Sequence, residues 1–201
     1  MFATIVSWIA VFMLGVVIVG LLISHDWRWS LGLLAALYVA TAWLVGQHWP
    51  AGMAAVKLVT GWMAAAALGM THLALPEQEE EDTSWPQGIP FRLFAAAIIV
   101  VIAFAAAQRI EDLIPGIGLP VVVGSLLLIS SGLLQLGITS QILRVTIGLL
   151  TFLSGFEILY AAVESSILVA GLLAVANLGL ALAGSYLLAQ SNTTTEEEEV
   201  I

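Results

Sequence analysis

The chain has 201 residues, of which 61% are hydrophobic and only 9% are charged, and its formal net charge is −9 at pH 7. A soluble domain carries about 25% charged residues, so this composition excludes an ordinary soluble protein. The sequence contains no cysteine, which excludes disulfides, thiol chemistry and Cys-ligated iron–sulfur clusters. The acidic balance argues against a nucleic acid as partner.

Apolar stretches recur along the chain at lengths of about 17 to 25 residues, which a helix needs to cross a bilayer. They lack the period-2 alternation of barrel strands and therefore predict helices, whose backbone polar groups are paired internally. We expect an all-α polytopic membrane protein with about seven transmembrane helices, and the lipid bilayer as its surroundings. In chain order, the predicted spans are residues 2–24, 30–48, 51–74, 92–108, 119–137, 142–163 and 166–189.

Residues 2–24 lack a basic n-region and a small-residue cleavage site, so they predict a retained helix and not a signal peptide. Polar or helix-breaking segments separate the spans, among them "SHDWRWS" after the first and "RIEDLIPGIGLP" after the fourth. The acidic clusters "PEQEEEDTSW" and "EEEE" are expected to lie in a solvated linker and a solvated tail.

The arginines give an orientation. With the N-terminus outside, Arg28, Arg92 and Arg144 fall on the cytoplasmic side and only Arg109 falls outside. Cytoplasmic loops carry an excess of basic residues, so this orientation is favoured over its reverse. The C-terminus and both acidic clusters are then expected in the cytoplasm.

A weak internal repeat links the two ends of the chain. "RWSLGLL" at 28–34 resembles "RVTIGLL" at 144–150, and "AVKLVTG" at 55–61 falls opposite "VANLGLA" at 175–181 after a slip of four residues. Leu, Gly and Ala are abundant, so a chance match stays open. The predicted organisation is a first three-helix repeat at 1–75, an acidic cytoplasmic linker at 76–91, a connector helix and loop at 92–118, a second, parallel three-helix repeat at 119–190, and an acidic tail at 191–201.

Two ionisable residues lie inside predicted spans. Lys57 is six residues past Ala51, about 9 Å below the outer end of its helix, and Glu157 is seven residues before Glu164, about 10 Å below the same surface. An ion pair between spans three and six is therefore possible. Lys57 could instead snorkel to the headgroups, and Glu157 could be a neutral, hydrogen-bonded acid. A role of either in proton movement is the third interpretation. Asn177 is expected to form an interhelical hydrogen bond.

A family resemblance rests on "ILRVTIGLL…SGFEILYAAVESSILVAGLLAVANLGLALAGSYLLA" over 142–189. This pattern resembles the last three helices of hydrogenase-4 component E. It is more distantly similar to the K-type small subunit of respiratory complex I and to the C-type subunit of Mrp antiporters. "AAVKLVTGWMAAAALGMTHLALP" resembles the third helix of component E, which also carries a Lys at the corresponding place. The resemblance implies a prokaryotic inner membrane and large antiporter-like membrane subunits as partners.

The sequence departs from this family at its acidic positions. The position that component E has in its sixth helix falls on Leu153, with Glu157 one turn later on nearly the same face. The acidic position of the K-type third helix falls on Asn177, which does not titrate.

Three functions are weighed. The first is an integral membrane subunit of a complex-I-like or membrane-bound-hydrogenase-like ion-translocating assembly, with Lys57, Glu157 and Asn177 in a proton or cation path. The second is a structural scaffold subunit whose polar axis is interrupted at Leu153 and Asn177. The third is a small independent transporter. The sequence shows no nucleophile–base pair, phosphate loop, metal-ligand spacing or cofactor motif. We therefore expect no catalytic residue, cofactor or metal, and at most a non-catalytic subunit of an oxidoreductase or antiporter complex.

Overall fold

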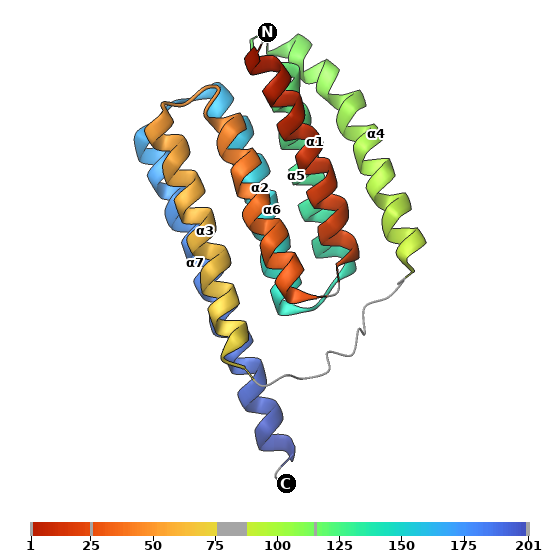
Figure 1. The fold of residues 1–201 in the computed structure, drawn as a ribbon, viewed down its shortest axis with the longest axis vertical. Coiled ribbons are helices and arrows are strands. Elements are labelled where there is room, and N and C mark those ends of the chain that lie inside the picture. The colour runs from red at the N-terminus through yellow and green to blue at the C-terminus, as the bar shows by residue number, and fades with distance from the viewer. Residues whose placement is uncertain (1, 25, 76–87, 115, 200–201) are drawn as a thin grey trace.

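The computed structural model describes residues 2–24, 26–75, 88–114 and 116–199, and these residues form seven helices without a strand. Each helix is long and apolar enough to cross a membrane, which confirms the predicted all-α polytopic fold. The helices are α1 (Phe2–Ile23), α2 (Trp27–Val45), α3 (Ala51–Leu73), α4 (Ile89–Leu113), α5 (Leu119–Ile138), α6 (Ile142–Val163) and α7 (Ile167–Glu199) (Figure 1).

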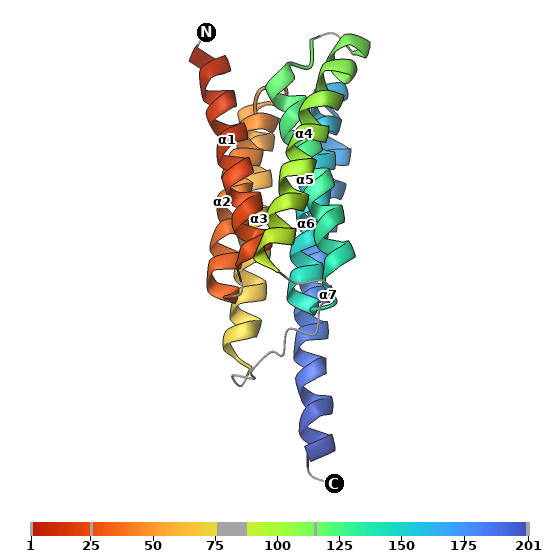
Figure 2. The same ribbon diagram turned by 90° about the vertical axis from the view of Figure 1, so that its right-hand side faces the viewer.

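Six of the helices form two layers. Helices α1, α2 and α3 lie in one layer and α5, α6 and α7 in the other, as the two views together show (Figures 1 and 2). Helix α1 packs on α5, α2 on α6, and α3 on α7, while α4 covers the edge formed by α1 and α5. The helices that the sequence pairs as repeats are thus neighbours in space. The repeat itself stays a prediction.

Two helices begin three residues earlier than predicted. Helix α2 begins at Trp27, three residues early, because the Asp26 carboxylate accepts a hydrogen bond of 2.9 Å from the Arg28 backbone N–H and caps the helix. Helix α4 covers 89–113, well beyond the predicted 92–108. Its early start has Pro90 in the first turn, where the missing N–H costs nothing.

The predicted acidic segments have different outcomes. Residues 76–87, most of the predicted linker, lie outside the described residues. Helix α7 continues through most of the predicted acidic tail to Glu199. Hydropathy measures compatibility with lipid and not helicity, so the end of the apolar run at residue 189 did not mark the end of the helix.

Two arginines complete the C-terminal end of α1. Arg92 Nη1 donates to the Leu22 carbonyl at 3.0 Å, and Arg144 Nη2 donates to the Ser24 carbonyl at 2.8 Å. The last carbonyls of a helix have no partner within it and carry the negative end of its dipole, so cations are favourable there. We call the end of the bundle that holds Arg28, Arg92 and Arg144 the arginine end. The inside–outside orientation stays a prediction.

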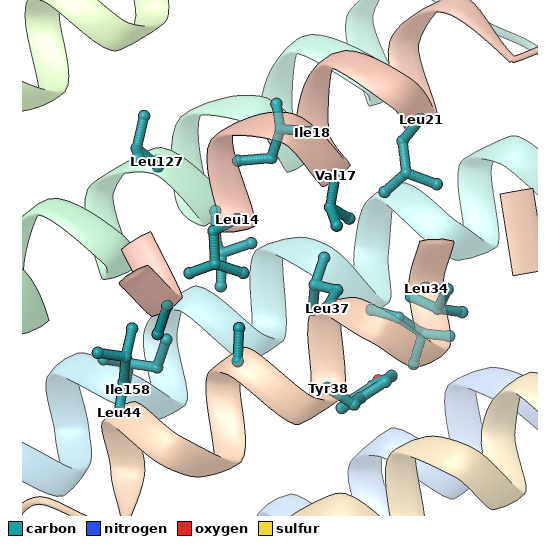
Figure 3. Close-up of a cluster of buried hydrophobic side chains, with 14 of the residues drawn as sticks. Leu14, Val17, Ile18, Leu21, Leu34, Leu37, Tyr38, Leu44, Leu127 and Ile158 are labelled. Atoms are coloured by element: carbon teal, nitrogen blue, oxygen red, sulfur yellow. The ribbon is translucent and has the colours of Figure 1, made fainter. Parts of the chain in front are cut away.

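The tightest helix contact joins α5 and α6. A Cβ atom on Gly132 would lie 2.7 Å from the Gly148 carbonyl oxygen, and one on Gly155 would lie 2.7 Å from the Ser125 carbonyl oxygen. Small residues let helix backbones approach closely in a membrane. Beside this contact lies the buried apolar core, which includes Leu14, Leu37 and Ile158 from three different helices (Figure 3).

Candidate functional site

The site begins with a buried ion pair between α3 and α6. Lys57 Nζ contacts Glu157 Oε2, and the two residues are only 5% and 3% exposed. Because the Lys57 side chain is buried and turned inward, the snorkelling interpretation is wrong for this structure. The helices bring the two charges to one level, as residue counting from the helix ends allowed.

Two further side chains brace the pair. Asn177 Nδ2 donates to Glu157 Oε1 at 2.6 Å, and the Tyr38 hydroxyl donates to Asn177 Oδ1 at 3.1 Å. An ionised carboxylate only accepts hydrogen bonds, so the amide nitrogen of Asn177 must face Glu157, which leaves its oxygen for the phenol. The predicted interhelical hydrogen bond of Asn177 is confirmed.

The Tyr38 ring also contacts Lys57. The ammonium lies 4.8 Å from the ring centroid, within the range of a cation–π interaction. Tyr38, Lys57, Glu157 and Asn177, which we call the polar cluster, therefore join four helices: α2, α3, α6 and α7. Every member is at most 5% exposed.

Gly61 makes the room that Tyr38 needs. It lies four residues after Lys57, on the same face of α3. A Cβ atom at Gly61 would overlap the Tyr38 ring, so glycine is required for the ring to lie against this helix. Figure 3 shows the Tyr38 side chain pointing away from the leucines of α1.

A cavity of about 130 Å³ reaches the pair from between α3 and α7. Its walls include Met53 and Val56 of α3 and Ala174 of α7, and the side chains of Lys57 and Glu157 line it. This volume has room for several water molecules, and the pair supplies polar partners for them. The two side chains of the pair thus border a space that water can fill.

Trp49, in the α2–α3 connection at one end of the bundle, also lines the cavity. Its indole Nε1 donates to the Glu164 carbonyl at 2.9 Å, which ties the α2–α3 connection to the end of α6. We call this the Trp49 end. It lies opposite the arginine end.

The chemistry open to the site is proton exchange. A carboxylate and an ammonium in contact can share or pass on a proton. The Asn177 amide, itself bonded to the Tyr38 phenol, holds the carboxylate in place. Among the described residues, no group of three or more His, Asp or Glu side chains lies close enough to hold a metal ion.

The chain matches no known protein family, no curated protein and no solved structure.

The structure brings together all three residues singled out from the sequence and adds one. Lys57, Glu157 and Asn177 meet, whereas Leu153 is partly exposed and outside the cluster. Tyr38 was missed. A signal existed, because a phenol in the middle of an apolar span needs a partner for its hydroxyl.

Proposed function

We propose that the chain is an integral membrane subunit of an ion-translocating assembly, of the complex-I-like or membrane-bound-hydrogenase-like kind. In this proposal the polar cluster belongs to an intramembrane path for protons or cations. The observation that carries the proposal is the buried Lys57–Glu157 pair, which borders a cavity instead of being sealed in the core.

Energetics support a role beyond stability. A lysine or an acid at the centre of a span costs about 2.5 to 3.5 kcal/mol on insertion scales. Well-packed apolar side chains are often as stabilising as a buried ion pair, or more so. Stability alone therefore does not explain a charged pair buried at this depth. Its position beside space for water fits a role in which its charges take part.

The partners in this proposal are large antiporter-like membrane subunits. Helices α3 and α7 have surface left to meet these subunits, because only 33% and 17% of the residues in their most apolar 18-residue stretches are buried within the chain. Exposed apolar side chains on these faces include Val59 and Met63 of α3 and Leu172 and Leu182 of α7.

One observation favours a second function, a structural scaffold. The polar cluster links four helices by hydrogen bonds and an ion pair, and such a clamp would also hold a bundle together without moving an ion. In this reading Asn177 marks an interruption in the path, because an amide does not titrate.

The experiment replaces Glu157 by Gln and Lys57 by Met, one at a time. The chain is tagged and purified with its bound subunits from its own membranes, the subunit content is checked, and the assembly is reconstituted in liposomes. Proton uptake is followed with a pH-sensitive dye, and sodium uptake with ²²Na⁺. Glu164→Gln is the matched control, because that carboxylate lies exposed at the end of α6.

Both substitutions at the pair are expected to lower translocation at least about tenfold in an intact assembly, while Glu164→Gln leaves it unchanged. Unaltered translocation in Glu157→Gln and Lys57→Met would favour the scaffold. If the chain purifies alone and moves a solute into liposomes, the independent transporter replaces both subunit functions.

A further inference from the structure

Helix α6 carries buried polar side chains on successive turns, starting at the pair. Ser154 and Thr151 precede Glu157 at intervals of three residues, and they are 0% and 1% exposed. Side chains three residues apart on a helix are neighbours, with Cβ atoms about 5 to 6 Å apart. We call this row of buried polar side chains on α6 the stripe. It continues from Glu157 toward the arginine end.

The two hydroxyls differ from other buried hydroxyls of the bundle. Ser125 and Ser131 of α5 donate to carbonyls of their own helix. Within the described part of the chain, Thr151 Oγ1 has no hydrogen-bond partner, and the Ser154 hydroxyl meets only that of Tyr38. A buried hydroxyl left in this way costs about 1 to 3 kcal/mol, and the usual remedy is an ordered water.

Polar groups continue from Thr151 along α6 toward the arginine end. Gly148, one turn further along α6, packs against buried Gln135 of α5, and a Cβ atom on Gly148 would lie 3.4 Å from the Gln135 Cβ. About one turn beyond is Arg144, whose Nη2 bonds to the Ser24 carbonyl at the arginine end. From Glu157 to Arg144 the helix rises about 20 Å, and a polar side chain lies beside each turn.

We propose that this one chain contains a proton route across the membrane. Its parts are the cavity at the Trp49 end, the Lys57–Glu157 pair, the hydroxyls of Ser154 and Thr151, and Gln135 with Arg144 at the arginine end. The proposal deepens the proposed function and rests on it, because it names the ion and the path within the same site.

The route balances protons at each step. A hydronium ion in the cavity gives a proton to the Glu157 carboxylate and becomes water, while the carboxyl group becomes neutral and loses its attraction to Lys57. The protonated carboxyl then donates to a water held by Ser154. Each hydroxyl accepts a proton on its oxygen and releases its own to the next oxygen, so no hydroxyl keeps a charge. The last proton passes to water at the arginine end. The Gln135 amide and the Arg144 guanidinium keep their own protons and only hold that water. The stripe is almost fully buried and offers only one hydroxyl oxygen on each turn, too few to replace the hydration shell of a sodium ion, so it suits a proton.

The first arm of the test asks whether water fills the cavity. The chain has no cysteine, so Ala174→Cys and Val175→Cys each introduce a single thiol. Ala174 lines the cavity, whereas Val175, the next residue, is 66% exposed on the outer face of α7. A charged, membrane-impermeant methanethiosulfonate reagent is added to each side of proteoliposomes containing the purified full assembly.

Reaction needs the thiolate, which forms in water and not in lipid. We expect Ala174→Cys to react from the Trp49 side only, and Val175→Cys to stay unmodified from both sides. An unreactive thiol at 174, or equal reaction at both positions, would overturn the cavity as a water entrance.

The second arm removes one hydroxyl at a time. Thr151→Val and Ser154→Ala are expected to lower proton translocation at least about tenfold, and Thr151→Ser, which restores the hydroxyl, to retain it. Thr146→Val is the matched control on the same helix, because Thr146 Oγ1 is already bonded to the Ile142 carbonyl and meets Gly184 of α7.

The outcomes separate the two proposals. If Glu157→Gln blocks translocation while Thr151→Val and Ser154→Ala do not, the route is wrong and the proposed function stands. If Glu157→Gln has no effect either, the proposed function fails and the route fails with it. Equal loss in Thr146→Val and Thr151→Val would indicate a packing effect and refute the route.

Discussion

Replacing Glu157 by Gln keeps the shape of the side chain and the carbonyl that accepts from Asn177, but it leaves the Lys57 ammonium without its counter-charge. The ammonium is buried, since Lys57 is only 5% exposed. Removing one partner of a buried pair costs about 3 to 5 kcal/mol, and the insertion cost of a lysine in a span is about 2.5 to 3.5 kcal/mol. We expect Glu157→Gln to lower the free energy of unfolding by about 3 kcal/mol.

Lys57→Met should cost less, about 1 kcal/mol, because Asn177 still donates to the carboxylate and no ammonium is left without a counter-charge. The double variant buries neither charge and should also lie within about 1 kcal/mol of the natural chain. The coupling energy of the pair is therefore expected to be about 3 kcal/mol.

The assay is reversible unfolding in mixed micelles by titration with sodium dodecyl sulfate, followed by far-UV circular dichroism. Glu164→Gln serves as the control, with an expected change below about 0.5 kcal/mol. A coupling energy below about 0.5 kcal/mol, with the costs of the single substitutions adding up in the double variant, would refute the view that the two charges depend on each other.

Two further changes probe the packing of the cluster by the same unfolding assay. Gly61→Ala should destabilise the protein by about 1 to 3 kcal/mol, because its Cβ overlaps the rigid Tyr38 ring. Gly171→Ala is the control, because nothing lies within 4 Å of a Cβ there, and it should be neutral or slightly stabilising. Equal effects of the two substitutions would contradict this role of Gly61. Tyr38→Phe removes the donor to Asn177 and should cost about 0.6 and at most 1.7 kcal/mol, while Tyr38→Leu also removes the ring face under Lys57 and should cost more. A Phe variant as unstable as the Leu variant would show that the ring face contributes nothing.

Much of the fold was predictable because lipid imposes simple rules. A long apolar run must be a helix, so the number and order of spans followed from hydropathy alone. Boundaries were harder, since they depend on local caps. Asp26 moves the start of α2 upstream, and α4 continues through Arg109, Glu111 and Asp112 because helical hydrogen bonding does not require apolar side chains.

The depth of the site residues along their helices was predictable, but the helix faces that meet at the site were not. The fixed rise of a helix put Lys57 and Glu157 on one level. Which face of α2 turns toward them depends on how α2 packs, and its sequence is apolar on all sides. The sequence therefore marked Tyr38 as a phenol that needs a partner but did not place it beside the pair, and the fit of its ring against Gly61 was visible only in three dimensions.

The Lys57–Glu157 pair also has a consequence for how the chain is made. The two residues are far apart in the sequence, on α3 and α6. When spans leave the ribosome in order, the lysine enters the bilayer well before the residue that neutralises it exists. Until then we expect the flexible side chain to place its ammonium in the headgroup region. Arrival of the sixth span draws it inward, so that the nascent bundle closes around its charges only late in synthesis.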